Sequence, residues 1–465
     1  MTSEVIVMNS LAVALATDSN ASIQTDKGTK LYRADKLFML SKYEPVGIMV
    51  HNNGSLHGIP WHTIIKMYRA RLGRRAFGSL EDYGLDFIEY LEDSATGLFP
   101  DEVQRKDYIE ALRQLYRRIN STILERIDEE VEEGGKPDPE ALAAQVIQEF
   151  YDEWAAEPEA KCFPQDLSRE LTGRWSPQIS ELGFRSFPGL PLPDVLMERL
   201  RDLAQFVICK DRILMETKTG IVIAGFGREQ HYPVAQTFEF GEIYSGKLKY
   251  RHTGKEAITH TNRVVVRPFA HSDMSDSFLR GISPAFEVRM TEELVQLATE
   301  LPEIIVDAVP RLSAQTRERL KAKFQPLSAE AVEKIVRRLE EYRVDSHRAP
   351  IYSAIENLPK DELAQAAAWL VNLNSQQSRM SMEPETVGGP IDVAVISKGD
   401  GFIWIDRKHY FKPELNQHFF RNYDKSSEAG ESHGAKGKED SGKEKVTKGT
   451  KRRARRRANV RRRGN

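Results

Sequence analysis

Four residues near the start of the chain have side chains and a spacing that suit nucleophilic catalysis, beginning with Thr2. Thr2 follows the initiator methionine, and a small second residue is the type that aminopeptidases expose. After removal of Met1, the hydroxyl and the free α-amine would belong to one residue. Such an amine has an ordinary pKa of about 8, so it can accept the hydroxyl proton at neutral pH. The sequence therefore predicts an N-terminal threonine nucleophile, on condition that Met1 is removed.

Three further residues complete this catalytic set. Asp18 lies 16 residues after Thr2, at the end of the strand that should pair beside it, and Lys36 opens the next strand. A buried lysine near the hydroxyl would lower the hydroxyl pKa, and Asp18 would hold that lysine charged and oriented. Gly54 follows at a break between strand and helix, where a backbone N–H can receive an oxyanion.

The elements that must position these residues follow from the hydrophobic pattern. Residues 4–18 predict two short strands, 36–40 and 46–50 a second pair, and 64–72 a helix. Between residues 79 and 205, apolar residues recur mainly at helical spacing. Strands are expected at 219–226, 234–240, 242–250, 262–266, 391–396 and 401–405, and helices around 332–339 and 363–373. Hairpins that feed covering helices indicate a layered α+β fold.

The first 19 residues, MTSEVIVMNSLAVALATDS, resemble the start of proteasome-type N-terminal-nucleophile (Ntn) hydrolases, in which an Asp follows the mature threonine by 16 residues. Ala34-Asp35-Lys36-Leu37 resembles the segment that carries the family's lysine, and Asn53-Gly54-Ser55 its oxyanion turn. TGIVIAGF and GGPIDVAVISKGDGFIWI resemble its central strand and its closing strand pair. The resemblance covers about residues 2–75 and 219–410.

This resemblance implies a four-layer αββα sandwich and a threonine-type endopeptidase that works without metal or cofactor. It also implies a peptide or unfolded-protein substrate, a homo-oligomer that can be a ring, and an ATP-dependent unfoldase partner. We expect four parts: 2–78 and 206–420 as the two halves of the Ntn-hydrolase domain, 79–205 as a helical insertion, and 421–465 as a disordered basic tail.

The resemblance also suggests three residues around the catalytic set. Ser272 is the candidate for a supporting hydroxyl before the third helix of the family, although a helix N-cap explains it equally well. Asn20 and Ser22 fall where the family pairs with substrate, with a polar turn as the competing account. The family's Asp and Ser before its Gly-Gly strand are replaced here, because residues 382–387 read MEPETV.

Charge and composition limit the partners of the tail and the location that we expect for the protein. The net charge of -2 combines a tail, 421–465, with 16 Lys/Arg against 6 Asp/Glu, and a body with 51 against 63. The tail has no aromatic beyond its first residues, so it would bind nucleic acid through phosphates, or dock on an acidic protein, or serve as a solubility tail. The N-terminus lacks a signal-peptide pattern and no apolar run would span a bilayer, so we expect a cytoplasmic protein.

Metal and cofactor motifs are missing from the sequence. His51, His57 and His62 are the closest histidines, but their spacing does not place three ligands on one helical face. Cys162 and Cys209 are too far apart in sequence for a thiolate zinc motif. Two alternatives to the peptidase stay open: a non-catalytic proteasome-like scaffold whose insertion and basic tail bind partners or nucleic acid, and a small-molecule amidase on the same fold.

Overall fold

The computed structural model describes residues 2–25, 28–164, 167–190, 192–213, 218–381, 387–409 and 411–418. The chain divides into two compact units, Met1–Lys408 and His409–Asn465. In the second unit, the described part includes the short helical turn Pro413–Leu415.

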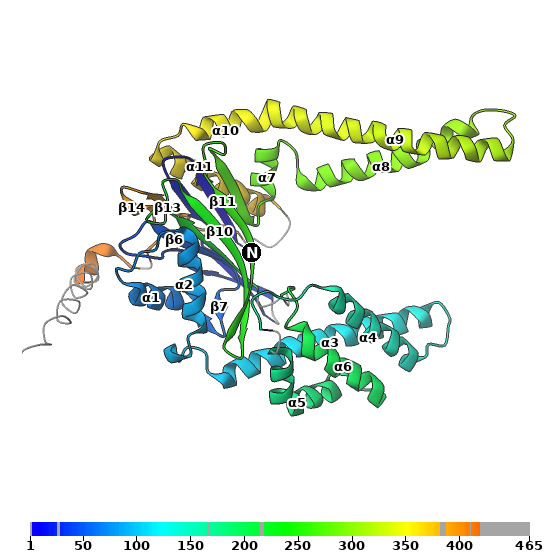
Figure 1. Ribbon diagram of the computed structural model, residues 1–465, viewed down its shortest axis with the longest axis horizontal. Coiled ribbons are helices and arrows are strands. Elements are labelled where there is room, and N and C mark those ends of the chain that lie inside the picture. The colour runs from blue at the N-terminus through cyan, green and yellow to red at the C-terminus, as the bar shows by residue number, and fades with distance from the viewer. Residues whose placement is uncertain are drawn as a thin grey trace, which may run out of the picture. The chain divides into compact units, whose positions relative to one another are not determined.

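The first unit contains two five-stranded sheets (Figure 1). One has the antiparallel order β12-β1-β2-β13-β14, with bounds Val265–Ala270, Ser3–Met8, Val13–Thr17, Asp392–Ser397 and Gly401–Asp406. The strands at its centre come from the two ends of the unit. The sheet therefore forms only when the start of the chain meets residues close to 400.

The second sheet has the order β11-β10-β9-β6-β5, with bounds Lys247–Ala257, Val234–Tyr244, Thr219–Gly225, Val46–Asn52 and Leu37–Met39. The predicted strand over 242–250 is wrong, because β10 continues to Tyr244 and the chain turns at Ser245 and Gly246. Both turn residues have positive φ angles, 51° and 75°, as a tight hairpin requires.

Two small hairpins leave the sheets. Strands β3 (Asn20–Thr25) and β4 (Gly28–Arg33) pair directly after β2, and β7 (Ser55–Leu56) pairs with β8 (Ile59–Pro60) directly before the first helix. Neither hairpin has the alternating apolar pattern on which the sequence prediction of strands depended.

One apolar core lies between the two sheets. Ile6 and Met8 of β1 share it with Met49 of β6 and Val222 of β9. Gly47 permits this close approach, since a Cβ there would lie 2.8 Å from Ile396 Cδ1. The alternation of β strands sends the intervening residues to the outer faces.

Helices cover both outer faces. Helices α1 (Trp61–Leu72) and α2 (Leu80–Glu92) share a core with β6, β9 and β10, and Figure 1 shows them beside this sheet. Helices α7 (Asp273–Arg280), α10 (Ala349–Glu356) and α11 (Lys360–Met380) contribute to a core with β1, β2 and β13. Ser79 begins α2 with a capping box, in which its hydroxyl accepts from Asp82 N and the Asp82 carboxylate accepts from Ser79 N.

Four helices between α2 and β9 form a further core, to which Tyr244 of β10 also contributes. They are α3 (Asp101–Glu132), α4 (Pro139–Ala156), α5 (Leu167–Ser186) and α6 (Asp194–Val207). Asp138 caps α4 through the backbone N–H groups of Glu140 and Ala141, and Pro139 begins the helix. Tyr108 and Tyr116 of α3 donate their hydroxyl protons to carbonyls of α6, so the buried tyrosines are satisfied.

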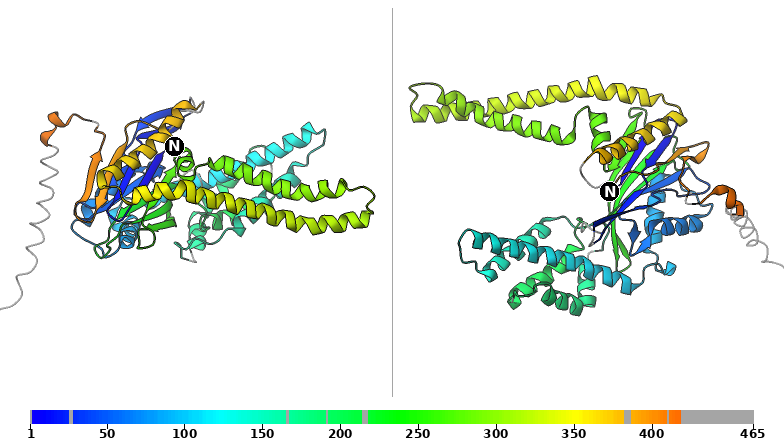
Figure 2. Two further views of the ribbon diagram at one scale, coloured as in Figure 1. Left: turned by 90° about the horizontal axis from the view of Figure 1, so that it is seen from above. Right: turned by 180° about the vertical axis from the view of Figure 1, so that it is seen from behind.

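A second pair of long helices, α8 (Pro284–Asp307) and α9 (Ala314–Arg343), follows α7. The two helices run side by side in Figures 1 and 2 and make many mutual contacts. A π-helical turn, Val344–Arg348, connects α9 to α10. None of the helices in the described ranges is long and apolar enough to cross a membrane.

Candidate active site

Asp18 is the centre of a buried hydrogen-bond network at the end of β2. Its Oδ1 accepts from Lys36 Nζ at 2.6 Å and from the backbone N–H of Ser3 at 3.0 Å. Its Oδ2 accepts from the N–H of Gly388 at 2.9 Å and, at 3.3 Å, from that of Asn20. The carboxylate is fully buried, and four donors satisfy it as a charged group.

Lys36 lies directly before β5, and its backbone carbonyl accepts from Val50 of β6. Its ammonium is buried and donates to the Asn20 carbonyl as well as to Asp18. Burial lowers the Lys36 pKa below its ordinary value, and the charge and hydrogen bond of Asp18 oppose that change, as does the charge of Glu4. A buried lysine held this way can stabilise a neighbouring alkoxide.

Thr2 precedes β1 and is also buried. Its carbonyl accepts from His271 N at 2.8 Å, which continues the pairing of β1 with β12. Because the next residue, Ser3, donates its N–H to Asp18, the Thr2 end of β1 borders the oxygen that binds Lys36. Met1 is outside the described residues.

Gly54 lies between β6 and β7 and is adjacent to the start of α1 through its carbonyl, which accepts from Trp61 N at 3.1 Å. A Cβ at Gly54 would meet nothing within 4 Å, so the space beside it is open. It is therefore the carbonyl, and not the N–H, that joins Gly54 to the helix terminus.

Ser272 and the serine three residues later have different surroundings. Ser272 begins α7 without a side-chain cap, and its hydroxyl donates to Asp276 Oδ2 at 2.6 Å. Ser275 is fully buried, and Asn374 Nδ2 of α11 donates both to Ser275 Oγ at 3.1 Å and to Ser3 Oγ at 2.8 Å. The hydroxyl connected to the start of β1 is thus that of Ser275, which the sequence analysis missed.

Asn20 and Ser22 both lie on β3. The Asn20 carbonyl accepts from Lys36, so its backbone belongs to the network. Ser22 pairs with Leu31 across the hairpin, and nothing further is described for its side chain. The sequence contains no feature that distinguishes the role of Asn20 from that of Ser22.

The glycine pair Gly388-Gly389 faces the same network. The Gly388 carbonyl accepts from the N–H groups of Ser19 and Asn20, each at 3.1 Å. Gly389 has a φ of 81°, and a Cβ there would lie 2.8 Å from Asn20 Oδ1, so only glycine fits. Thr386 and the two glutamates before it fall outside the described residues, and Val387 is buried.

Glu4 and His51 form a buried pair that sequence reasoning did not find. Glu4 lies in β1 and is completely buried, and its Oε2 is 3.1 Å from His51 Nδ1 of β6. His51 stacks on Phe269, and a Cβ at Gly220 would lie 1.9 Å from its Nε2. Glu4 Oε1 has no partner among the described residues, so this oxygen needs a donor.

His57, Asp107 and Glu242 are close enough to be considered as metal ligands. However, Ile243 N–H donates to His57 Nε2 at 2.9 Å, so the proton of the neutral ring is on Nδ1 and points to Asp107 Oδ2 at 2.5 Å. A metal on Nδ1 would require the proton on Nε2, where the Ile243 N–H already points. These hydrogen bonds favour His57 as a structural residue that connects the β7–β8 turn to α3 and β10, and not as a metal ligand.

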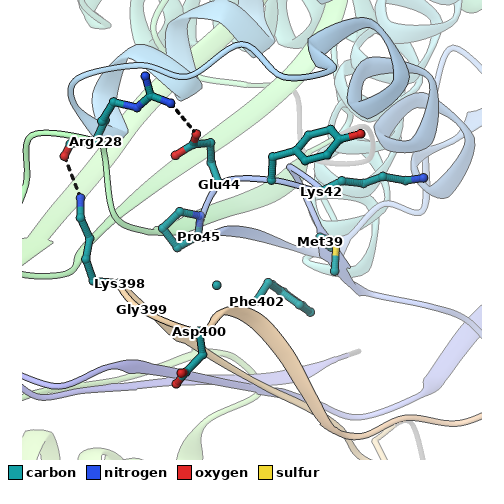
Figure 3. Close-up of a pocket in the computed structure, with 11 residues that line it drawn as sticks. Met39, Lys42, Glu44, Pro45, Arg228, Lys398, Gly399, Asp400 and Phe402 are labelled. Atoms are coloured by element: carbon teal, nitrogen blue, oxygen red, sulfur yellow. Dashed lines mark hydrogen bonds and ion pairs between the residues drawn. The ribbon is translucent and has the colours of Figure 1, made fainter. Parts of the chain in front are cut away.

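A cavity of about 330 Å³, drawn in Figure 3, does not include Asp18 in its lining. Its lining includes Glu44, whose carboxylate pairs with Arg228 at 3.1 Å, and Lys398, which donates to the Arg228 carbonyl at 2.8 Å. Strand β13 begins beside Thr17 and ends at Ser397, so this cavity is at the opposite end of the strands. We therefore place the candidate site by its hydrogen bonds and not by cavity size.

Comparison with known proteins adds little to this geometry. No family model matches the sequence, and no curated protein matches it. Among solved structures, the chain is similar to Anbu (Gly-1) mutant from Hyphomicrobium sp. strain MC1, with 11% identity and a TM-score of 0.26 over 95% of this chain and 100% of that chain. It is also similar to Anbu (ancestral beta-subunit) from Yersinia bercovieri, with 10% identity and a TM-score of 0.25 over 91% and 95%. These scores are too low to support an assignment.

Proposed function

We propose that the chain is a threonine-type N-terminal-nucleophile hydrolase that cleaves peptide amide bonds, built on an αββα sandwich. The observation that carries the proposal is the Asp18 carboxylate, whose Oδ1 accepts both from Lys36 Nζ and from the N–H of the residue after Thr2. A charged lysine beside the start of β1 can stabilise the Thr2 hydroxyl as it becomes an alkoxide.

The reaction proceeds in two stages once Met1 is removed. The Thr2 α-amine takes the hydroxyl proton, Thr2 Oγ adds to the amide carbon, and Lys36 stabilises the alkoxide as it forms. The C–N bond then breaks, the leaving amine takes the proton back, and an acyl-threonine ester remains. Water, deprotonated by the same amine, hydrolyses that ester and restores the hydroxyl.

Two further groups have supporting roles in the proposal. The Gly54 N–H receives the oxyanion, a role worth about 3 kcal/mol when such a donor is lost. Ser275 and Asn374 hold the first residues of β1 in place through Ser3 Oγ. In this proposal the Ser272 hydroxyl, which donates to Asp276, stabilises the start of α7 and does not contact the substrate.

An extended peptide is the substrate that suits a site bounded by the strand edge at β3 and the Gly388-Gly389 segment, because strand addition satisfies the backbone of both chains. The resemblance to proteasome-type hydrolases adds three further expectations: assembly of several copies, an ATP-dependent unfoldase, and a cytoplasmic site of action.

The proposal is tested by intact-mass measurement after incubation of the purified chain with an epoxyketone, which reacts with a threonine hydroxyl and its own α-amine. We expect a protein that lacks Met1 and gains one adduct, and no adduct in Thr2→Ala. Thr253→Ala, which removes a threonine from the exposed part of β11, should label like the wild type.

Retained Met1, or labelling that Thr2→Ala does not abolish, would contradict the threonine mechanism. The non-catalytic scaffold would then be the better account, and the buried Val387 before the glycine pair agrees with it. A small-molecule amidase would show the adduct but would cleave short amides in preference to long peptides.

A further inference from the structure

The α8–α9 hairpin exposes apolar side chains that its own packing cannot cover. Its seam uses Ala298, Pro302 and Val306 of α8, spaced four residues apart, and Ser328 of α9 donates to the Ala298 carbonyl at 2.7 Å. None of the residues of α9 is buried. Two antiparallel helices expose much of their apolar surface to water, whereas four helices can enclose it.

Exposed apolar residues lie on both sides of the hairpin, and five of them gather on one face. Leu297, Leu301 and Ile304 of α8 are 49%, 38% and 57% exposed, and their spacing of four and three residues aligns them. Leu327 and Ile335 of α9 are 54% and 44% exposed. We call these five residues the hairpin face.

The two sides of the hairpin differ. A groove of about 290 Å³ lies between the helices and is itself partly apolar, with Val295 and Thr299 of α8 and Ala329 of α9 in its lining. With about 100° of rotation per residue, Leu297 and Leu301 lie across the seam from Thr299, and Leu327 lies across it from Ala329. The hairpin face is therefore the side away from this groove.

The two helices carry opposite charge. Helix α8 has six acidic residues and one basic residue, whereas α9 has eight basic and five acidic residues. Within the hairpin, Lys321 pairs with Glu303 and Arg317 with Asp307, each near the loop end. The same helical arithmetic places Glu293 and Glu300 along the α8 edge of the hairpin face, and Lys323 and Lys334 along its α9 edge.

We propose that the hairpin face binds the same face of a second copy of this chain, so that two hairpins form an antiparallel four-helix bundle. An acidic edge and a basic edge on one face are self-complementary under a two-fold axis, because each α8 then lies along the α9 of the other copy. The basic tail of this chain is a poor occupant, since residues 421–465 contain no Leu, Ile, Phe, Met or Trp. This inference does not depend on the threonine chemistry.

Charge reversal gives a test that identifies the partner. In the full chain, Glu293→Lys with Glu300→Lys makes both edges basic, and Lys323→Glu with Lys334→Glu makes both edges acidic. We expect each double variant alone to dissociate at least tenfold more readily than the wild type in sedimentation velocity. An equimolar mixture of the two should associate again, because basic edges then meet acidic ones.

Two controls separate this interface from general effects of charge and folding. Glu129→Lys with Glu133→Lys reverses the same charge on the exposed end of the insertion helix α3 and should leave the sedimentation unchanged. Circular dichroism should show wild-type helix content in every variant, since the exposed pairs that are lost, Arg289–Glu293 and Glu330–Lys334, contribute little to helix stability.

A wild-type chain that stays monomeric at the highest soluble concentration would overturn the proposal. Unchanged association in both reversal variants would overturn it as well. So would a mixture that fails to associate, because two monomeric variants of opposite charge must bind one another if the partner is a second hairpin. Retained or lost epoxyketone labelling has no bearing on any of these outcomes.

Discussion

Asp18 connects chain segments that are separated from one another in the sequence. One carboxylate oxygen joins the start of β1 to Lys36, and the other joins Asn20 to Gly388. Both oxygens need donors because the group is completely buried. The carboxylate therefore fixes the positions of Ser3, Lys36 and Gly388 relative to one another and favours the charged form of Lys36.

Replacement of Asp18 by asparagine tests this charge. Burial already lowers the pKa of Lys36, and Asp18 is the strongest group that raises it. Without that carboxylate the pKa falls further, so less Lys36 is charged at neutral pH, and its charged form returns only as the pH is lowered. We expect the epoxyketone labelling rate at pH 7.5 to drop by about 10² to 10⁴.

The matched control is Asp35→Asn, which removes the exposed carboxylate beside Lys36 in sequence. Its labelling rate should stay within about twofold of wild type. Equal losses in the two variants would mean that Asp18 has no specific role in holding the charge of Lys36.

At the scale of elements, the sequence predicted strands β1, β2, β6 and β9 because their apolar residues are dense and flanked by turns. It missed the β3–β4 hairpin, whose residues Asn20–Arg33 are mostly polar, and α8, which contains Pro302 in its interior. The Asp18–Lys36 contact joins the ends of strands in different sheets, and it was expected from the residue types and from the resemblance to the family's catalytic set. The Asn374–Ser3 and Glu4–His51 contacts join positions 371 and 47 residues apart, and nothing local marks them.

The Glu242 carboxyl connects β10 to the β7–β8 turn and lies against α3. Burial raises its pKa to about 7, with the nearby His57 opposing and Asp107 adding to that rise. A raised carboxyl pKa means that the folded state holds the proton more tightly, so stability is greatest below the unfolded pKa and is lost as the pH rises toward 7. The loss from this group is on the order of 3 kcal/mol.

Glu242→Gln should remove this pH dependence. Urea unfolding of the wild type should show a higher midpoint at pH 5 than at pH 8, and the variant should show a smaller difference between the two. The neutral amide still accepts from His57 N–H through its oxygen, which the structure places at 3.2 Å. An identical difference in the two proteins would show that Glu242 does not titrate in this range.

At the scale of the whole molecule, charge is distributed unevenly between body and tail. Residues 1–420 have 51 Lys/Arg and 63 Asp/Glu, and 421–465 have 16 and 6. A net charge of -2 therefore hides two parts of opposite sign. We expect the tail to bind polyanions through phosphates or sulfates, without base specificity.

A chain that ends at residue 420 checks this expectation. The full chain should bind single-stranded RNA at low salt, with an affinity that falls steeply as salt increases, while the shortened chain should bind at least tenfold more weakly. A full chain with neutral glutamines at the nine Lys/Arg positions of 451–463 should behave like the shortened one. Equal RNA binding by all three would place the interaction in the body.

The bond between Asp18 and Gly388 spans 370 residues of sequence. A chain still attached to the ribosome has made Thr2 and Lys36 long before it makes the glycine pair, so the hydrogen bonds of the Asp18 carboxylate stay incomplete until residue 388 has been made. Folding of β13 between β2 and β14 has the same long delay. The order of synthesis itself thus keeps this hydrogen-bond network unassembled, and only a chain that has been made beyond residue 388 can complete it.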